Sequence, residues 1–244
     1  MTVDVPQTVI LLGGLGTRLQ ELHPELPKAL VPVAGRPFLD RQLSWLVEQG
    51  VSSVVLAAGY RAEQIEAHAA STWADRLEIM VSVETSPLGT GGAIRHCNQH
   101  LRSETVLVMN GDTLLPGLDL ASFISTHHER SATASIAVVA MNQPNRYGTV
   151  ETNAQGGIVR FREKAAVARG LVNGGYYLLE QKIIEPLPDG RAISLENELF
   201  PQLAQEGKLF ASEFPPPLLD MGTPGGIEEM ETFFSLASDG APPF

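Results

Sequence analysis

The stretch TVILLGGLGTRLQELHPELPK, residues 8–28, joins an apolar run to a glycine-rich turn and two separated cations. Its first part, TVILL, is a short continuous apolar run that ends at glycine, which predicts a buried strand at 8–12. Glycines allow backbone N–H groups to approach phosphate oxygens, and the side chains of Arg18 and Lys28 would balance the phosphate charge. The stretch therefore predicts a phosphate-binding turn at the end of the first strand.

Two familiar phosphate-binding motifs do not fit this turn. A Walker loop needs Gly-Lys followed by Ser or Thr after four intervening residues, and that pattern is missing. A dinucleotide fingerprint needs a third glycine where Leu19 stands, and no acidic residue follows the second predicted strand. An NAD-dependent oxidoreductase is thereby disfavoured. For GGLG taken alone, a plain tight turn between solvated charges stays open as an alternative.

Composition excludes several classes of function. Seventeen Lys and Arg stand against 28 Asp and Glu, and the net charge of -11 argues against broad binding to nucleic acid or to anionic membrane. The chain has no apolar run of bilayer length, and MTVDVPQT lacks the features of a signal peptide, so a cytoplasmic protein is expected. The single cysteine, Cys97, excludes an internal disulfide and a thiolate metal cluster. Any metal would therefore be held by oxygen.

The pattern of apolar residues predicts an α/β fold, a doubly wound mixed sheet. Up to about residue 130, apolar runs bounded by glycines alternate with segments of helical spacing, typical of parallel strands joined by crossover helices. Later segments alternate apolar and polar residues, which predicts antiparallel additions to the sheet. The expected strands are 8–12, 53–59, 77–84, 105–112, 132–141, 147–153, 157–164 and 170–179, and the expected helices are 37–50, 62–73, 91–101, 183–187 and 198–207.

Seven motifs occur in an order that is similar to that of the sugar-phosphate nucleotidylyltransferases. These enzymes join a sugar 1-phosphate to a nucleoside triphosphate and release pyrophosphate. The matching motifs are GGLGTRL followed by PK, ETSPLGTGGA (84–93), NGD (110–112), RYGTV (146–150), FREK (161–164), LVNGGYYLL (171–179) and DMGTP (220–224). Since they run from residue 13 to residue 224, the resemblance covers nearly the whole chain.

The resemblance implies a Rossmann-like, GT-A-like fold of the nucleotide-diphospho-sugar transferases. It implies one domain, 1–244, in which about 1–130 bind the nucleotide and about 131–234 bind the sugar phosphate, followed by a tail at 235–244. Many relatives carry a C-terminal left-handed β-helix. Because this chain stops about twenty residues after DMGTP, no such β-helix is expected.

The resemblance also assigns roles to individual residues. Arg18, Lys28 and Asp112 would be catalytic, and Asp112 with Asp220 would hold one Mg²⁺, an ion that prefers hard oxygen donors. The nucleotide would contact Leu12, Gly13, Gly14, Gly16, Thr17, Glu84, Pro87, Gly89, Thr90 and Gly111. The sugar phosphate would contact Tyr147, Gly148, Glu163, Lys164, Asn173 and Gly174. No protein nucleophile is required, because phosphoryl transfer is accelerated mainly by positioning and charge stabilisation.

The choice of base rests on Glu84, which falls where the family contacts the base. A carboxylate accepts two hydrogen bonds, and guanine offers two adjacent donors, whereas uracil and thymine present carbonyls. GTP is therefore the favoured nucleotide, although Glu84 could bond backbone instead.

The motifs most closely resemble D-glycero-D-manno-heptose 1-phosphate guanylyltransferases, which supply GDP-heptose for bacterial surface polysaccharides. Mannose 1-phosphate with GTP, glucose 1-phosphate with dTTP and MurNAc 1-phosphate with UTP are the alternatives. A non-catalytic subunit that binds nucleotide sugars is a further alternative, disfavoured because a pure binder has no need of two metal carboxylates.

Five residues without an assigned role carry separate expectations. His127 and His128 are neighbours with Glu129 and are expected to form a solvated helix end, because adjacent histidines on a helix point in different directions. Cys97 is expected to be a buried small apolar residue. Trp45 and Tyr176 look exposed and would permit a homodimer interface.

Overall fold

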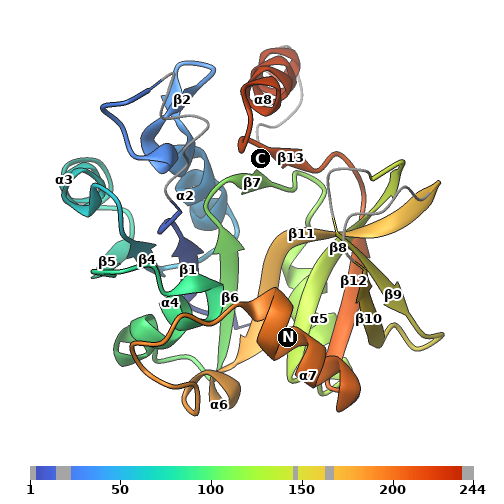
Figure 1. The fold of residues 1–244 in the computed structure, drawn as a ribbon. Helices are drawn as coiled ribbons and strands as arrows, with labels where there is room; N and C mark the ends of the chain where they lie inside the picture. The colour runs from blue at the N-terminus through green and yellow to red at the C-terminus, as the bar shows by residue number, and fades with distance from the viewer. Residues whose placement is uncertain (1–3, 15–22, 145–147, 163–167, 238–244) are drawn as a thin grey trace.

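The protein folds around one nine-stranded mixed sheet (Figure 1). The computed structural model describes residues 4–14, 23–144, 148–162 and 168–237. The main path through the sheet runs β10-β9-β11-β6-β1-β4-β5, while β8 pairs with β11 and with β12.

Parallel strands joined by helices form the first half of the sheet. The strands are β1 (Thr8–Leu11), β4 (Ser53–Ala58), β5 (Glu78–Val83) and β6 (Thr105–Asn110), and they lie side by side in the order β5-β4-β1-β6. The connecting helices are α2 (Phe38–Glu48), α3 (Ala62–Thr72) and α4 (Gly89–Cys97), the last continued by a 3-10 turn at Asn98–His100. The strand order reverses between β1 and β6, which makes this pair the topological switch point of the sheet.

Helices cover both faces of the sheet, because apolar side chains along the strands point to both faces. In β1, Val9 packs into one apolar cluster and Ile10 into another, because successive side chains of a strand point to opposite faces. One cluster takes apolar side chains from α2, α3 and α5 (Leu120–Glu129). The other takes them from α4, α6 (Gln181–Ile184) and α7 (Phe200–Gln205). The predicted doubly wound fold is confirmed.

The second half extends the same sheet with antiparallel strands and one parallel strand. β11 (Arg169–Glu180) pairs antiparallel with β6, with β8 (Ala134–Asn142) and with β9 (Thr149–Thr152), and β9 pairs with β10 (Ile158–Arg162). β12 (Leu209–Phe214) pairs parallel with β8. The expectation of purely antiparallel additions is therefore wrong for β12, a strand that the pattern of residues did not predict.

A small separate group of elements lies at the carboxyl edge of the parallel strands, at the top of Figure 1. It contains the ribbons β2 (Pro32–Val33) with β3 (Arg36–Pro37) and β7 (Thr113–Leu114) with β13 (Leu219–Asp220), together with α8 (Pro224–Ala237). Its own apolar cluster includes Phe38, Leu219 and Met230. Because β13 pairs with β7, the polypeptide near residue 220 returns to the end of β6.

Several sequence-based expectations about boundaries and exposure need correction. Trp45 and Tyr176 are 2% and 0% exposed and pack edge to face, so the homodimer argument that depended on their exposure is wrong. His127 is 1% exposed rather than solvated, whereas Cys97 is buried as expected. The helix expected at 198–207 begins as a π-helical turn at Leu195–Leu199 and continues as α7. Among the described residues, no helix combines the length and apolarity needed to cross a bilayer.

Candidate active site

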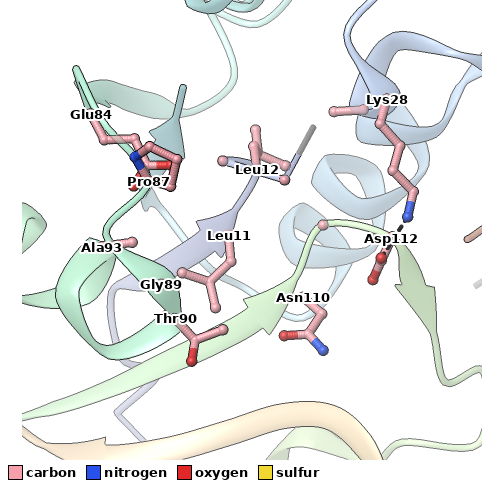
Figure 2. Close-up of a pocket in the computed structure, with 14 residues that line it drawn as sticks. Leu11, Leu12, Lys28, Glu84, Pro87, Gly89, Thr90, Ala93, Asn110 and Asp112 are labelled. Carbon is pink, nitrogen blue, oxygen red and sulfur yellow. Dashed lines mark hydrogen bonds and ion pairs between the residues drawn. The ribbon is translucent and has the colours of Figure 1, made fainter. Parts of the chain in front are cut away.

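A cavity of about 500 Å³ lies at the carboxyl ends of β1, β5 and β6 (Figure 2). This is the switch point, where open α/β sheets place their ligands. The lining residues are Leu11, Leu12, Gly13, Gly14, Lys28, Ala29, Glu84, Pro87, Gly89, Thr90, Ala93, Asn110, Gly111 and Asp112.

The pairing of β1 with β6 brings the first two motifs together. Leu11 and Asn110 are register partners at the ends of these strands, and Gly111 donates its N–H to the Leu11 carbonyl at 3.0 Å. A Cβ on Gly111 would lie 2.6 Å from that carbonyl oxygen, so this close approach requires glycine. The glycine turn that follows β1 therefore opens beside Asp112.

Lys28 and Asp112 form the charged wall of the cavity. The Lys28 Nζ lies 2.6 Å from Asp112 Oδ2, and the Thr113 hydroxyl donates to Asp112 Oδ1 at 3.0 Å. Lys28 opens a short 3-10 turn, Lys28–Leu30, whose Ala29 and Leu30 are buried and anchor the lysine backbone. The lysine side chain is 16% exposed and that of Asp112 is 37% exposed, so the pair faces the open side of the cavity.

Asp220 approaches this pair through the β7–β13 ribbon. Asp220 is the register partner of Thr113, and Met221 donates its N–H to the Asp112 carbonyl at 3.0 Å. The Gly222 N–H donates to Asp220 Oδ1 at 2.6 Å, which orients the carboxylate. Two acidic residues 108 positions apart in the chain are thus held together, Asp112 directly before β7 and Asp220 in β13.

The donor set at this point suits a hard divalent cation. A Cβ placed on Gly222 would lie 2.8 Å from Asp220 Oδ1 and 3.6 Å from Lys28 Nζ, so glycine leaves open the space between these groups. Within the part of the chain that the structure describes, no group of three or more His, Cys, Asp or Glu side chains could cage a metal. Two carboxylates without a full cage fit Mg²⁺, which usually keeps water and substrate phosphates among its ligands.

Glu84 stands on the opposite wall, at the end of β5. Its N–H bonds the Ala58 carbonyl at 2.8 Å, and its Oε2 accepts the Leu88 N–H at 3.2 Å. A Cβ on Gly13 would overlap Glu84 Oε1, so the glycine turn and the carboxylate are in mutual contact. Burial raises the pKa of Glu84, and the hydrogen bond from Leu88 offsets part of that effect. The side chain is therefore a partly desolvated acceptor at the cavity wall.

The glycines of α4 pack against a distant segment, 191–195. Gly91 donates its N–H to the Ile193 carbonyl at 2.8 Å, and Ile193 donates its own N–H to the Leu88 carbonyl at 2.8 Å. A Cβ on Gly92 would lie 2.5 Å from the Arg191 carbonyl oxygen. The glycine-rich motif thus serves helix packing, whereas Gly89 and Thr90 line the cavity.

A turn within β11 borders the cavity on the side expected to bind sugar. The Gly175 N–H donates to Asn173 Oδ1 at 2.9 Å, and the ladder with β8 shifts register between Asn173 and Tyr177. Gly175 has a φ of +76°, and a Cβ on it would lie 2.9 Å from Nδ2 of the cavity residue Asn110. A Cβ on Gly174 would lie 2.9 Å from the Ala137 carbonyl oxygen, so this glycine allows close packing in the core.

The structure brings together most of the site residues that the sequence predicts. Ten of them line the cavity, namely Leu12, Gly13, Gly14, Lys28, Glu84, Pro87, Gly89, Thr90, Gly111 and Asp112. Asp220 lies beside it through the contacts above, and Asn173 precedes the turn whose Gly175 packs against Asn110. Gly174 packs against the core, and Gly148 is exposed next to β9. Gly16, Thr17, Arg18, Tyr147, Glu163 and Lys164 fall outside the described residues.

Two polar residues were missed. Asn110 lines the cavity directly before Gly111, and its place in NGD was an available signal. Glu196 accepts a hydrogen bond from the cavity residue Thr90 at 3.0 Å, although 106 residues separate the two. No motif in the sequence marks Glu196, because only the folded chain brings it to this position.

Comparison with known proteins finds relatives that match most of the chain. Mannose-1-phosphate guanylyltransferase of Mycobacterium tuberculosis is 36% identical over 227 residues, which are 92% of this chain and 63% of that protein. The chain therefore spans less than two thirds of the mycobacterial relative. D-glycero-alpha-D-manno-heptose 1-phosphate guanylyltransferase of Aneurinibacillus thermoaerophilus is 33% identical over 89% of this chain and 94% of that protein.

A solved structure and a family model extend the comparison. The crystal structure of HddC from Yersinia pseudotuberculosis, complexed with GMP-PN, superposes with a TM-score of 0.84 at 30% identity. The match covers 94% of this chain and 99% of HddC. The model of the family described as nucleotidyl transferase matches residues 7–234. With this match, the chain belongs to the nucleotidyl transferase family.

Proposed function

We propose that this chain is a sugar-1-phosphate guanylyltransferase that transfers GMP from GTP to a sugar 1-phosphate and releases pyrophosphate. The observation that carries the proposal is the single cavity at the β1–β6 switch point. It combines a glycine turn, the Lys28–Asp112 pair and the carboxylate of Glu84. The relatives named above as guanylyltransferases support the choice of reaction.

The chemistry follows from the charges that the cavity presents. A phosphate oxygen of the sugar 1-phosphate attacks the α-phosphorus of GTP, and pyrophosphate leaves in line as its bond to that phosphorus breaks. Lys28 stabilises negative charge on the phosphoryl oxygens, and the N–H groups of the turn after β1 orient the triphosphate. Asp112 and Asp220 would hold Mg²⁺, which when bound supplies further charge stabilisation to those oxygens. Arg18 is expected to assist at the leaving pyrophosphate, and Lys164 at the sugar phosphate.

Glu84 supports GTP as the nucleotide. Its carboxylate is partly buried at the cavity wall and uses Oε2 for the Leu88 N–H. The remaining lone pairs suit the N1–H and the exocyclic amine of guanine, two adjacent donors that uracil and thymine lack. If Glu84 instead only accepts the backbone hydrogen bond, its carboxylate should cause no difference in turnover among nucleotides with different bases.

For the sugar, we propose D-glycero-D-manno-heptose 1-phosphate, which would give GDP-heptose for surface polysaccharide. The near-complete overlap with the heptose enzyme of Aneurinibacillus thermoaerophilus favours it. Mannose 1-phosphate is the second candidate, favoured by the 36% identity to the mycobacterial enzyme.

Pyrophosphate release with Mg²⁺ tests the proposal. GTP, ATP, CTP, UTP and dTTP are each paired with heptose, mannose, glucose and MurNAc 1-phosphates. Selective turnover of GTP with the heptose phosphate is the expected result, and selective turnover with mannose 1-phosphate changes only the sugar. Turnover with UTP or dTTP instead contradicts the role of Glu84. Nucleotide binding without turnover of any pair contradicts the enzymatic function and favours a binding subunit.

A further inference from the structure

Glu196 is the centre of a hydrogen-bond network that joins the two halves of the proposed site. It lies in the π-helical turn Leu195–Leu199, outside every motif that the sequence carries. Its Oε2 accepts from the hydroxyls of Thr90 and Ser194 at 3.0 and 3.1 Å. Its Oε1 accepts from the Tyr177 hydroxyl at 3.4 Å, and the Tyr177 oxygen in turn accepts from Asn173 Nδ2 at 3.0 Å.

The chemistry of a carboxylate sets the direction of every hydrogen bond in this network. An ionised carboxylate only accepts, so Tyr177 must donate to Glu196 and is left to accept from the Asn173 amide. Burial, and then the charge of Glu196, raises the pKa of Tyr177, so its hydroxyl keeps the proton that it donates. Since Asn173 Oδ1 already accepts from the Gly175 N–H, both ends of the amide are assigned.

An oriented Asn173 has one amide hydrogen left for a substrate. One Nδ2 hydrogen is used by Tyr177, and no described residue accepts the second. Asn173 lies two residues before Gly175, which packs against the cavity residue Asn110. We propose that Glu196 is a positioning residue which, through Tyr177, fixes Asn173 as a hydrogen-bond donor to a hydroxyl oxygen of the sugar 1-phosphate. This inference rests on the proposed function, because it names how the same site selects its sugar.

Replacing Glu196 by glutamine keeps the shape of the side chain and changes only the network. Thr90 and Ser194 both donate, so they keep the glutamine oxygen on their side and leave the amide nitrogen facing Tyr177. The Tyr177 oxygen then accepts from glutamine and must donate to one of the two amides beside it, Asn173 or Asn110. Donation to Asn173 requires Asn173 to present its oxygen. The rotated Asn173 would direct its Nδ2 at the Gly175 N–H, placing two donors face to face.

Steady-state kinetics of E196Q and Y177F test the inference, with the sugar 1-phosphate and nucleotide that the wild type turns over. The expected result is a rise of about tenfold or more in KM for the sugar 1-phosphate, the equivalent of one misdirected buried hydrogen bond. The KM for the nucleotide is expected to stay within about twofold, because Thr90 keeps its acceptor. In the double variant, the KM for the sugar 1-phosphate should rise no further than in the more affected single variant. Both substitutions release the same group, the side-chain amide of Asn173.

E198Q is the matched control. Glu198 lies two residues away on the same turn, but it pairs with Arg191 at 2.7 Å and not with Tyr177. Unchanged sugar KM in both E196Q and Y177F, with an active wild type, overturns the inference alone. An equal rise in KM for both substrates also overturns it, because that is the result of general loosening. If E196Q fails to fold, Y177F decides by the same criteria. A wild type inactive with every substrate pair overturns the proposed function, and this inference with it.

Discussion

At the scale of single residues, the contact between Lys28 and Asp112 is the most direct indication of phosphate chemistry. A lysine and an aspartate that are 84 positions apart meet at 2.6 Å at the mouth of a cavity, although the pair is only partly buried. Partly exposed ion pairs contribute little to stability, about 0–1 kcal/mol. The location of the pair therefore suits charge stabilisation in a reaction better than stabilisation of the fold.

K28A should reduce kcat/KM by roughly 100-fold or more, the usual effect of removing one donor that stabilises transition-state charge. The free energy of unfolding should change by less than about 1 kcal/mol. The two quantities are measured by initial rates and by urea denaturation. K208A is the matched control, because Lys208 pairs with Glu206 at a similar 2.7 Å on the exposed surface. Full activity in K28A would remove Lys28 from the reaction.

E84Q should weaken the preference for guanine, because glutamine offers one acceptor and one donor where guanine presents two donors. The useful comparison is GTP against ITP, whose base lacks the exocyclic amine. The wild type should favour GTP by roughly tenfold or more in kcat/KM, and E84Q should bring that ratio close to one. A ratio unchanged by the substitution would assign Glu84 to the Leu88 backbone alone.

The contact between Gly13 and Glu84 predicts a steric effect that does not involve nucleotide. A methyl group at Gly13 would overlap Glu84 Oε1, whereas one at Gly14 meets no described atom within 4 Å. The overlap falls on the end of a flexible side chain that can turn away, so G13A should lower the free energy of unfolding by only about 1 kcal/mol, through loss of the Leu88–Glu84 hydrogen bond, and G14A by less than about 0.5 kcal/mol. Adding E84A should relieve the loss in G13A, so the double variant should be non-additive in denaturant melts. Equal losses in G13A and G14A would contradict the close contact.

At the scale of whole elements, α5 is attached to the sheet by a buried histidine at its C-terminal end. His127 Nδ1 lies 2.8 Å from the Ser135 hydroxyl, and Nε2 lies 3.1 Å from Glu180 Oε1, which also accepts from Thr105 at 2.7 Å. Burial lowers the pKa of His127 and outweighs the opposing effect of its hydrogen bond to Glu180. The neutral ring can then donate from Nε2 to the carboxylate and accept from Ser135 at Nδ1.

This histidine should make the protein less stable as the pH falls from 7 to 5. A lowered pKa in the folded state means that the unfolded chain binds a proton first, near pH ~6.5, so acid favours unfolding. H127N should flatten the dependence of the unfolding free energy on pH. The slope that it removes is at most about 1.4 kcal/mol per pH unit, the value for one proton. The control is H128N, since His128 is the exposed neighbour. Identical slopes in the wild type and H127N would refute the assignment.

Helix α4 shows how one element serves both packing and the cavity. Its glycines allow the backbone at Ile193 and Arg191 to approach closely, and its Thr90 reaches both the cavity and Glu196. The Thr90 hydroxyl also accepts the Leu195 N–H at 2.8 Å. A chain segment from the second half is thereby fastened to the wall of the nucleotide half.

At the scale of the whole molecule, the sheet is continuous through both halves, and the cavity lies beside the strand at which they join. β6 pairs with β1 on one side and with β11 on the other. A ligand in this cavity would contact the turns after β1 and β5, which belong to the first half of the chain. It would also contact the ribbon of β7 and β13, whose second strand belongs to the second half, and so would link the two halves.

GTP with Mg²⁺ should consequently raise the melting temperature. At one hundred times its dissociation constant, a ligand stabilises by about 2.7 kcal/mol, or roughly 5–10 °C for a chain of this size. EDTA should abolish turnover and reduce the shift, and D220N should raise the Mg²⁺ concentration required for activity. CTP is the control nucleotide and should shift the melting temperature less. Turnover that persists in EDTA would exclude Asp112 and Asp220 as metal ligands.

The sequence by itself determined the α/β architecture and most of the site, because these depend on local pattern. The period of apolar residues reports the direction of side chains along each element, which is why β1, β4, β5 and β6 and the helices α2, α3 and α4 occur close to where they were expected. A polar or glycine motif directly after a strand lies at the edge of the sheet, which placed Gly13 and Asp112 there, whereas Glu84 was assigned to the same site by the family resemblance.

Only the tertiary structure decided which distant segments meet. The burial of Trp45, Tyr176 and His127, the parallel pairing of β12 with β8, and the position of Glu196 between Thr90 and Tyr177 have no local signal. Each depends on contacts between residues far apart in the chain, and their partners are chosen by the packing of the whole sheet. A short segment contains no information about which surface will cover it, and for that reason the pattern of residues could not predict these contacts.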